Sequence, residues 1–291
     1  MQTREASSPE IIEAGGRILT VYDLSQQLGN RTSAIEPNAH RIDYMDADQT
    51  AAMTETKFGI GPEFWPGGKG FCVETVTLST HAGTHVDAPA HYGPPPGRSR
   101  GRSIDEVPLR WCFGDGVRLD MRHKAPGEGI TRHEVQLELE RTGHILKPFD
   151  VVLLWTGTSA HFETSGYDQL HPGLRRDATE YLIDNGVRLI GIDAWGLDRP
   201  FDLMVREAIA GDHAQLWESH LLGREKEYCQ IEKLCHLERL PLSSGFTVSA
   251  FPVKLEGASA GWARVVAIFE GNADAQAGTG GGVGGIGAPS W

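Results

Sequence analysis

The segment LSTHAGTHVDAPAHYG, residues 78–93, constrains this chain more than any other feature. It places four side chains that can bind a metal ion or a proton within eleven positions: His81, His85, Asp87 and His91. A straight helix cannot gather them, because Asp87 would lie about 200° round from His85 at roughly 100° per residue. A straight strand would separate His81 from His85 by about 13 Å at roughly 3.3 Å per residue. The backbone must therefore bend between them.

Gly83 supplies the conformational freedom for this bend, and Pro89 restricts the chain after it. We expect a strand that ends in a bent loop, with His81, His85 and Asp87 turned towards a common point. Two imidazoles and a carboxylate suit Zn²⁺, Mn²⁺ or Fe²⁺ better than Ca²⁺ or Mg²⁺, which prefer oxygen ligands only. Three protein ligands would leave a position open for water, as in catalytic metal sites.

His91 follows these three residues and can stand beside the bound water as a proton carrier. A single histidine is more often a structural or solvated residue, so the argument rests on the density of the whole group. We expect the remaining histidines to be structural or solvated, with His161 and His213 as the first exceptions to consider.

Length and charge limit the kind of protein. A chain of 291 residues with 40% hydrophobic content can bury a core in one large domain or two small ones. The formal net charge of -12 repels phosphate backbones and anionic lipids, so we expect no nucleic-acid or membrane partner. The four cysteines form no CxxC pair, and the N-terminus lacks the basic-then-apolar order of a signal peptide. These features predict a cytoplasmic protein with reduced thiols.

Strand and helix patterns are mixed along the chain and predict an α/β domain of irregular order. We expect strands at residues 17–25, 71–80, 116–121, 149–157, 187–193, 245–256 and 262–270, the last two joined by a hairpin turn. We expect helices at residues 131–142, 172–186 and around 214–222. Residues 26–70 are polar and rich in turn formers, which favours a long ordered excursion rather than a helix bundle.

The expected organisation has three parts. Residues 1–16 form an N-terminal extension, and residues 17–270 form a single domain. Residues 271–291 are a glycine-rich tail with too few large apolar residues to pack, so we expect it to be disordered or loosely attached.

The motif HAGTHVDAPAH resembles the His-x-Gly-Thr-His-x-Asp-x-Pro-x-His signature of the cyclase-like metal-dependent hydrolases. That family includes bacterial kynurenine formamidase, isatin hydrolase and a trans-dienelactone hydrolase. A second segment, SHLLGREKEYCQIEKL, is similar to a downstream family segment in which a histidine precedes an acidic residue by twelve positions. It places His220 and Glu232 at these two positions. The resemblance covers about residues 17–270.

The resemblance implies the family's swivelling β/β/α fold and a homo-oligomer, either a dimer or a tetramer. It implies that His81, His85 and Asp87 bind one metal ion, and that Asp87 bridges to a second ion held by His220 and Glu232. One or two divalent ions, Zn²⁺ or Mn²⁺, would then be the cofactor.

The resemblance also assigns His91 the role of general acid and base. The implied enzyme is a metal-dependent hydrolase in which an activated water cleaves an amide, formamide or cyclic amide. We expect a planar or aromatic small-molecule substrate. Four aromatic residues that could otherwise belong to the core are candidates for binding it: Phe64, Trp65, Trp155 and Trp195. The excursion at 26–70 is longer than in the shorter formamidases, so the substrate stays open.

Three alternatives remain: a lactone hydrolase of the trans-dienelactone hydrolase type, a polyketide-type cyclase, and a metal- or ligand-binding protein without turnover. An intact His91 argues against the last. The segment GASAG, residues 257–261, formally matches the GxSxG nucleophile elbow of serine hydrolases. That elbow requires a helix after the serine and a later histidine, but a strand pattern follows and no histidine lies beyond His236. We therefore expect Ser259 to be a hairpin-turn serine.

Overall fold

A mixed sheet of ten strands forms the centre of the computed structural model, which describes residues 8–271. The strand order across it is β1-β2-β14-β12-β6-β8-β10-β11-β5-β13. Its strands are β1 (Glu10–Ala14), β2 (Arg17–Asp23), β5 (His85–Asp87), β6 (Phe113–Asp120), β8 (Val151–Trp155), β10 (Leu189–Ile192), β11 (Cys229–Glu232), β12 (Ser244–Ser249), β13 (Ala260–Trp262) and β14 (Val266–Glu270). Two small sheets pair β3 (Arg41–Met45) with β4 (Val73–Thr77), and β7 (Gly129–Ile130) with β9 (Gly173–Leu174).

The middle of the sheet is parallel, and two of its strands are almost completely buried. Strands β6, β8, β10 and β11 run parallel to one another. The sequences VVLLW in β8 and LIGI in β10 are almost entirely buried, as expected for parallel strands packed on both faces. Strand β5 then pairs antiparallel with β11 and places His85 opposite Glu232. This register joins the histidine motif to a strand that follows it by more than a hundred residues.

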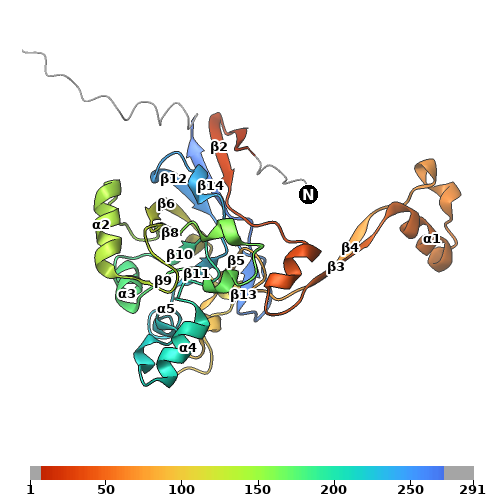
Figure 1. Cartoon of the computed structure of the whole chain (residues 1–291). Helices are drawn as coiled ribbons and strands as arrows, with labels where there is room; N and C mark the ends of the chain where they lie inside the picture. The colour runs from red at the N-terminus through yellow and green to blue at the C-terminus, as the bar shows by residue number, and fades with distance from the viewer. Residues whose placement is uncertain (1–7, 272–291) are drawn as a thin grey trace, which may run out of the picture.

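Three helices cover one face of this sheet, as Figure 1 shows: α2 (Arg132–Thr142), α3 (Arg176–Asp184) and α5 (Glu218–Leu222). Helix α2 begins where the sequence predicts, because the Thr131 hydroxyl accepts from the Glu134 N–H and the Glu134 carboxylate accepts from the Thr131 N–H. A further helix, α4 (Phe201–Ile209), lies outside these layers. A second core cluster is formed by side chains of the sheet itself, which include Phe246 of β12 and Phe269 of β14, and by the segments that pack on them.

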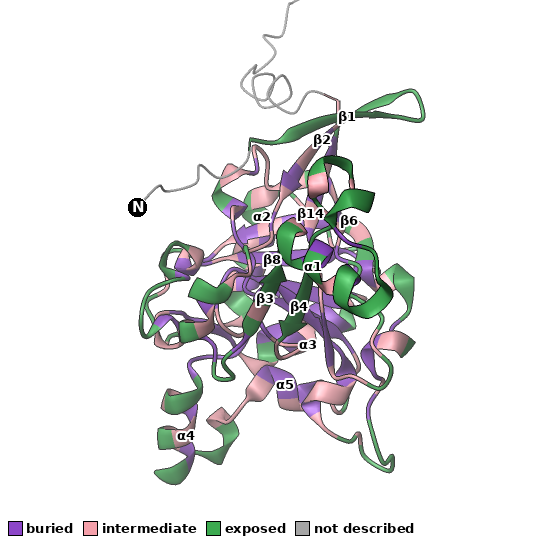
Figure 2. Cartoon of the chain, turned by 90° about the vertical axis from the view of Figure 1, so that its right-hand side faces the viewer, coloured by how far each residue is buried: buried purple, intermediate pink, exposed green. Residues whose placement is uncertain are grey.

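Residues 41–77 form an arm that projects from the body (Figure 1). The arm consists of the β3–β4 ribbon with helix α1 (Ala47–Phe58) at its end. In Figure 2 its strands and helix are mostly exposed, whereas the inner strands of the central sheet are mostly buried. Several large apolar side chains on the arm face solvent in this single chain: Tyr44, Phe58, Phe64, Phe71 and Val76.

Most of the expected elements are present, with differences that have local causes. The excursion at 26–70 contains the twelve-residue helix α1, which Asp46 caps by accepting the Asp48 and Gln49 N–H groups. The expected helix at 172–186 begins only at Arg176, because residues 173–174 pair with β7 as β9. Helix α4 was not expected.

The closing hairpin was also predicted wrongly in part. Strands β12 and β14 do pair with each other, but the chain between them forms β13, which pairs with β5. Residues 10–14, assigned to the N-terminal extension, form β1. The tail at 272–291 lies outside the described residues. Among residues 8–271, no helix has both the length and the apolar character needed to cross a membrane.

Candidate active site

Three consecutive pieces of backbone carry the histidine motif. A bend at residues 78–84 presents His81, strand β5 presents His85 and Asp87, and the 3-10 turn Pro89–Tyr92 presents His91. Gly83 adopts φ 60° within the bend, and a Cβ at this position would collide with Leu28. The predicted bend is therefore present: it follows strand β4, as expected, and leads into the short strand β5.

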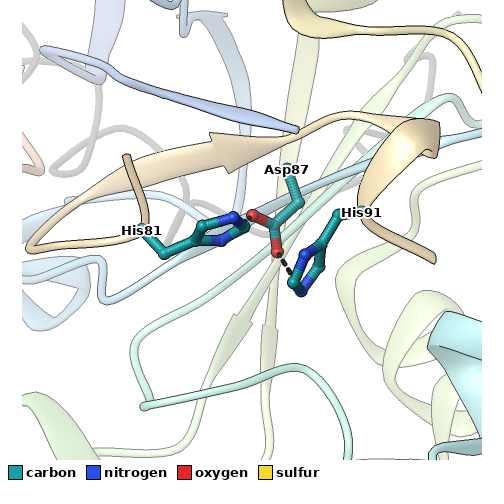
Figure 3. Close-up of side chains that lie close together, drawn as sticks. All are labelled: His81, Asp87 and His91. Carbon is teal, nitrogen blue, oxygen red and sulfur yellow. Dashed lines mark ion pairs between the residues drawn. The ribbon is translucent and has the colours of Figure 1, made fainter. Parts of the chain in front are cut away.

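Asp87 is at the centre of the cluster and is completely buried. Its Oδ1 lies 2.8 Å from His81 Nδ1 and 3.2 Å from His85 Nε2, and its Oδ2 lies 4.0 Å from His91 Nε2. Figure 3 shows His81 and His91 on either side of this carboxylate. Despite these short distances, neither Asp87 oxygen has an aligned hydrogen-bond donor.

The downstream pair lies beside this motif. Glu232, at the end of β11, places Oε2 3.6 Å from His85 Nε2 and Oε1 3.9 Å from His220 Nε2. Both carboxylates and the His85 and His220 rings are buried. The structure therefore gathers all six residues named from the sequence, although their individual roles stay predictions.

The geometry sorts the ligand atoms into two sets that share Asp87. One set is His81, Asp87 and His91, and the other is His85, Asp87 and Glu232; within each set the ligand atoms lie within 4.8 Å of one another. The sequence analysis instead grouped His81 and His85 on the first ion and reserved His91 for proton transfer. By position, His91 can serve either as a ligand or as a proton carrier.

Hydrogen bonds orient the rings for binding an ion. His85 Nδ1 donates to the Gly83 carbonyl at 2.8 Å, and His220 Nδ1 donates to the Asp198 carboxylate, so both Nε2 atoms present lone pairs. The buried His85 Nε2 has no hydrogen-bond partner, like the two Asp87 oxygens. A divalent ion between these atoms would satisfy all of them, so the residues present fit a borderline metal such as Zn²⁺ or Mn²⁺.

Burial and the neighbouring charges shift the pKa values of three residues in the cluster. Burial opposes ionisation of Asp87, yet His85 and His91 hold its pKa well below the ordinary value. Burial and the Asp87 charge raise the pKa of Glu232. Burial lowers the pKa of His91 to about 4, against the attraction of Asp87. His91 is therefore a neutral imidazole near pH 7, which can accept a proton.

A cavity of about 300 Å³ opens beside the cluster. The residues lining it include His81, His91, His220 and Glu232 from the cluster and Trp195, Phe201, Met204 and Trp217 from its surroundings. The Trp217 ring stacks on His220 with centroids 4.2 Å apart. A larger hollow of about 510 Å³ lies over β6, β12 and β14, away from the histidine–carboxylate cluster. The smaller cavity is the candidate active site because four residues of the histidine–carboxylate cluster line it.

Of the four aromatic residues expected to bind substrate, only Trp195 lines this cavity. Phe64 and Trp65 lie on the arm, where the Trp65 indole N–H donates a hydrogen bond to the Thr54 hydroxyl. Trp155 contacts the guanidinium groups of Arg118 and Arg122 instead. Within one chain these three side chains are placed away from the cavity, because the arm projects from the body and the arginines cover the Trp155 ring.

Several residues at the site were not found from the sequence. Asp198 orients His220, and Trp217 covers it, yet neither belongs to a recognisable motif. Ser259, assigned to a turn, places its hydroxyl 3.0 Å from His81 Nε2. His171 lines the cavity, whereas His161 and His213 are exposed and do not.

Sequence comparison finds relatives of this chain among the kynurenine formamidases. Kynurenine formamidase of Bacillus thuringiensis (strain Al Hakam) is 27% identical over 153 residues, which cover 47% of this chain and 65% of that protein. The Maricaulis maris (strain MCS10) kynurenine formamidase is 31% identical over 152 residues, covering 51% and 62%. This chain therefore matches less than two thirds of the length of either relative.

The same architecture occurs in solved structures. The crystal structure of an isatin hydrolase bound to the product analogue thioisatinate superposes with a TM-score of 0.68 at 20% identity, covering 87% of this chain and 93% of that one. A family model described as a putative cyclase matches residues 22–199, which is more than half of the chain and includes the whole histidine motif. On this match, the chain belongs to the putative cyclase family.

Proposed function

We propose that this protein is a metal-dependent hydrolase that cleaves an amide, formamide or cyclic amide with water. The observation that carries the proposal is the buried Asp87 carboxylate, whose two oxygens lack donors although imidazole nitrogens surround them. The names of the relatives, kynurenine formamidase and isatin hydrolase, support hydrolysis of a carbon–nitrogen bond. The adjoining aromatic cavity suits a small planar substrate.

The cluster would hold one or two divalent ions, Zn²⁺ or Mn²⁺. His81, His85 and Asp87 would bind the first ion, and Glu232 and His220 would share Asp87 to bind a second. When bound, such an ion lowers the pKa of a water molecule and polarises the substrate carbonyl. Asp198 would keep the His220 ring in the orientation that presents Nε2.

The protein's own residues would move the proton and place the substrate. His91, whose side chain is 25% exposed at the cavity, would take a proton from water and give it to the leaving nitrogen. Trp195 and Trp217 would border the planar substrate. The stacked Trp217 ring would also keep bulk water away from His220.

The proposal is tested by metal analysis of the purified protein and a substrate screen. The screen contains N-formylkynurenine, isatin and dienelactones, run on metal-stripped and on Zn²⁺- or Mn²⁺-loaded protein. We expect turnover of at least one carbon–nitrogen substrate, only in the loaded protein. Turnover of dienelactones alone would favour the lactone hydrolase, and stoichiometric metal without turnover would favour a binding protein.

A homo-oligomer, dimer or tetramer, is part of the same proposal. The arm exposes Phe58 at 69%, Phe64 at 66% and Tyr44 at 62% in the single chain, and a second copy would bury such side chains. Phe64 and Trp65 could then contribute to substrate binding only at the cavity of another copy. Light scattering after size-exclusion chromatography measures the oligomeric state. The cytoplasmic location stays a prediction.

A further inference from the structure

A buried ion pair lies beside the candidate metal cluster. Glu36 follows the 3-10 turn Asn30–Ile35, and Lys233 follows Glu232 at the end of β11. Their side chains are 2% and 3% exposed, and Lys233 Nζ lies 2.7 Å from Glu36 Oε2. Two charges buried this deeply are costly unless each is paired and hydrogen-bonded. The burial of this pair therefore suggests that it has a structural role at this place.

Each partner of the pair also holds the backbone of the bend that presents His81. Glu36 Oε1 accepts a hydrogen bond from the Gly83 N–H at 2.9 Å. The Lys233 ammonium donates to the His81 carbonyl at 3.0 Å. The pair thus fixes the bend at two peptide groups, immediately before His85 enters β5.

Lys233 is itself held firmly, in a conformation that its residue type rarely adopts. Its φ is 57°, in the left-handed region, which is unfavourable for a residue with a side chain. Its N–H donates to the Ala194 carbonyl at 2.9 Å, and its carbonyl accepts from the Thr84 hydroxyl at 2.6 Å. The surrounding structure therefore enforces this turn directly after Glu232.

The pair also reaches the wall of the cavity. Lys233 Nζ lies 4.1 Å from the centroid of the Trp195 ring, a cation–π distance. Lys233 thus makes contact with the bend on one side and with a cavity-lining aromatic ring on the other, and both Glu36 and Lys233 line the cavity.

From these contacts we infer that Glu36 and Lys233 are positioning residues, whose ion pair holds the bend so that His81 faces Asp87 while Glu232 faces His85. The inference rests on the metal-dependent function proposed above. It gives the N-terminal excursion a role, because Glu36 comes from that segment and reaches the cluster by a hydrogen bond that spans 47 positions of the sequence. Neither residue is expected to touch the ion or the reacting atoms.

The test measures Zn²⁺ affinity by competition with a chromophoric chelator, together with thermal unfolding of the metal-free protein. The variants are Glu36→Gln, Lys233→Met, the double variant Glu36→Gln/Lys233→Met, and Lys233→Arg. The double variant removes both charges, so it avoids an unpaired buried charge and should fold. Asp150→Asn is the matched control, since Asp150 is a buried carboxylate that pairs with His144 outside the cavity lining.

Residues that orient metal ligands typically contribute about 10- to 100-fold to metal affinity. We expect a loss in this range for Glu36→Gln, for Lys233→Met and for the folded double variant, with partial rescue in Lys233→Arg. Asp150→Asn should lower the unfolding temperature and leave Zn²⁺ affinity unchanged. Unchanged affinity in the double variant would overturn the positioning role and show that the pair serves stability alone.

The Zn²⁺ affinity measurement tests this inference independently of the substrate screen that tests the proposed function. A wild-type protein that binds Zn²⁺ but hydrolyses nothing in the screen overturns the hydrolase proposal, while the affinity comparison still decides the positioning role. A wild-type protein that binds no divalent metal overturns both.

Discussion

The metal cluster and the arm are close in sequence and very different in structure. The arm ends at Thr77, and the cluster begins at His81. His85 and Asp87 are fully buried, whereas Phe64 at the end of the arm is 66% exposed. The cluster is held by contacts from β11, β13 and α5, but the arm is held by the pairing of its own two strands.

This difference teaches how each region obtains its geometry. In the cluster, two ligand rings have hydrogen-bond partners from other elements of the chain: Asp198 for His220 and Ser259 for His81. Such contacts fix the orientation of the side chains that would bind metal. The arm is held mostly by the β3–β4 pairing and by two hydrogen bonds between Asn30 and Ile42, and it leaves large apolar side chains exposed that another surface could bury. We expect substitutions in the two regions to affect different measurements.

The largest expected effect comes from removing the charge at the centre of the cluster. Asp87→Asn should abolish both metal binding and turnover, and chelation of the wild type should reproduce the loss, because Asp87 is common to both ligand sets. Metal stoichiometry and initial rates on the same samples check this. Asp48→Asn, on the arm, should retain both. Full activity in metal-free protein would contradict the proposed chemistry.

A smaller loss is expected when the proton carrier is removed. His91→Ala should keep its metal and lose about 10²- to 10⁴-fold in kcat, the usual range for general acid–base groups. His81→Ala should lose metal and activity together. If His91→Ala emptied the site and His81→Ala left it filled, the roles within the set His81, Asp87 and His91 would be reversed.

The next largest difference between the cluster and the arm is expected in the unfolding free energy of charge-removing variants. Lys233→Met leaves Glu36 buried without its partner, which typically costs about 3–5 kcal/mol of unfolding free energy. Lys69 and Asp48 form an equally short ion pair on the arm, but both are exposed. Lys69→Met should therefore change the unfolding free energy little, since solvent screens such pairs. Chemical denaturation compares the two variants. Equal destabilisation would remove the contrast between the regions.

The smallest effect on the cluster is expected from the arm's apolar surface. The double variant Tyr44→Ser/Val76→Ser should weaken the oligomer while leaving metal stoichiometry unchanged, because both side chains are more than half exposed on the ribbon. Light scattering and metal analysis measure the two properties. A wild-type monomer, or an unchanged oligomer in the variant, would show that this surface does not mediate assembly.

The sequence by itself determined the features that depend on neighbouring residues. The spacing of His81, His85 and Asp87 required a bend, and Gly83 supplies it at φ 60°. The capping pattern at Thr131 located the start of α2, because a cap is formed by residues three positions apart. The length of the motif was also enough to indicate the family.

Only the tertiary structure decided which residues from distant parts of the sequence contact one another. Strand β5 lies between β11 and β13, and this order places Glu232 opposite His85 and Ser259 against His81. The packing of residues 30–36 beside the end of β11 also brings Glu36 and Lys233 together. The residues of each pair are separated by long stretches of chain, so no local pattern reports their contact. The position of Phe64 was also decided by the tertiary structure. The pairing of β3 with β4 forms the arm, and the arm places Phe64 away from the cavity, which the residue type alone does not indicate.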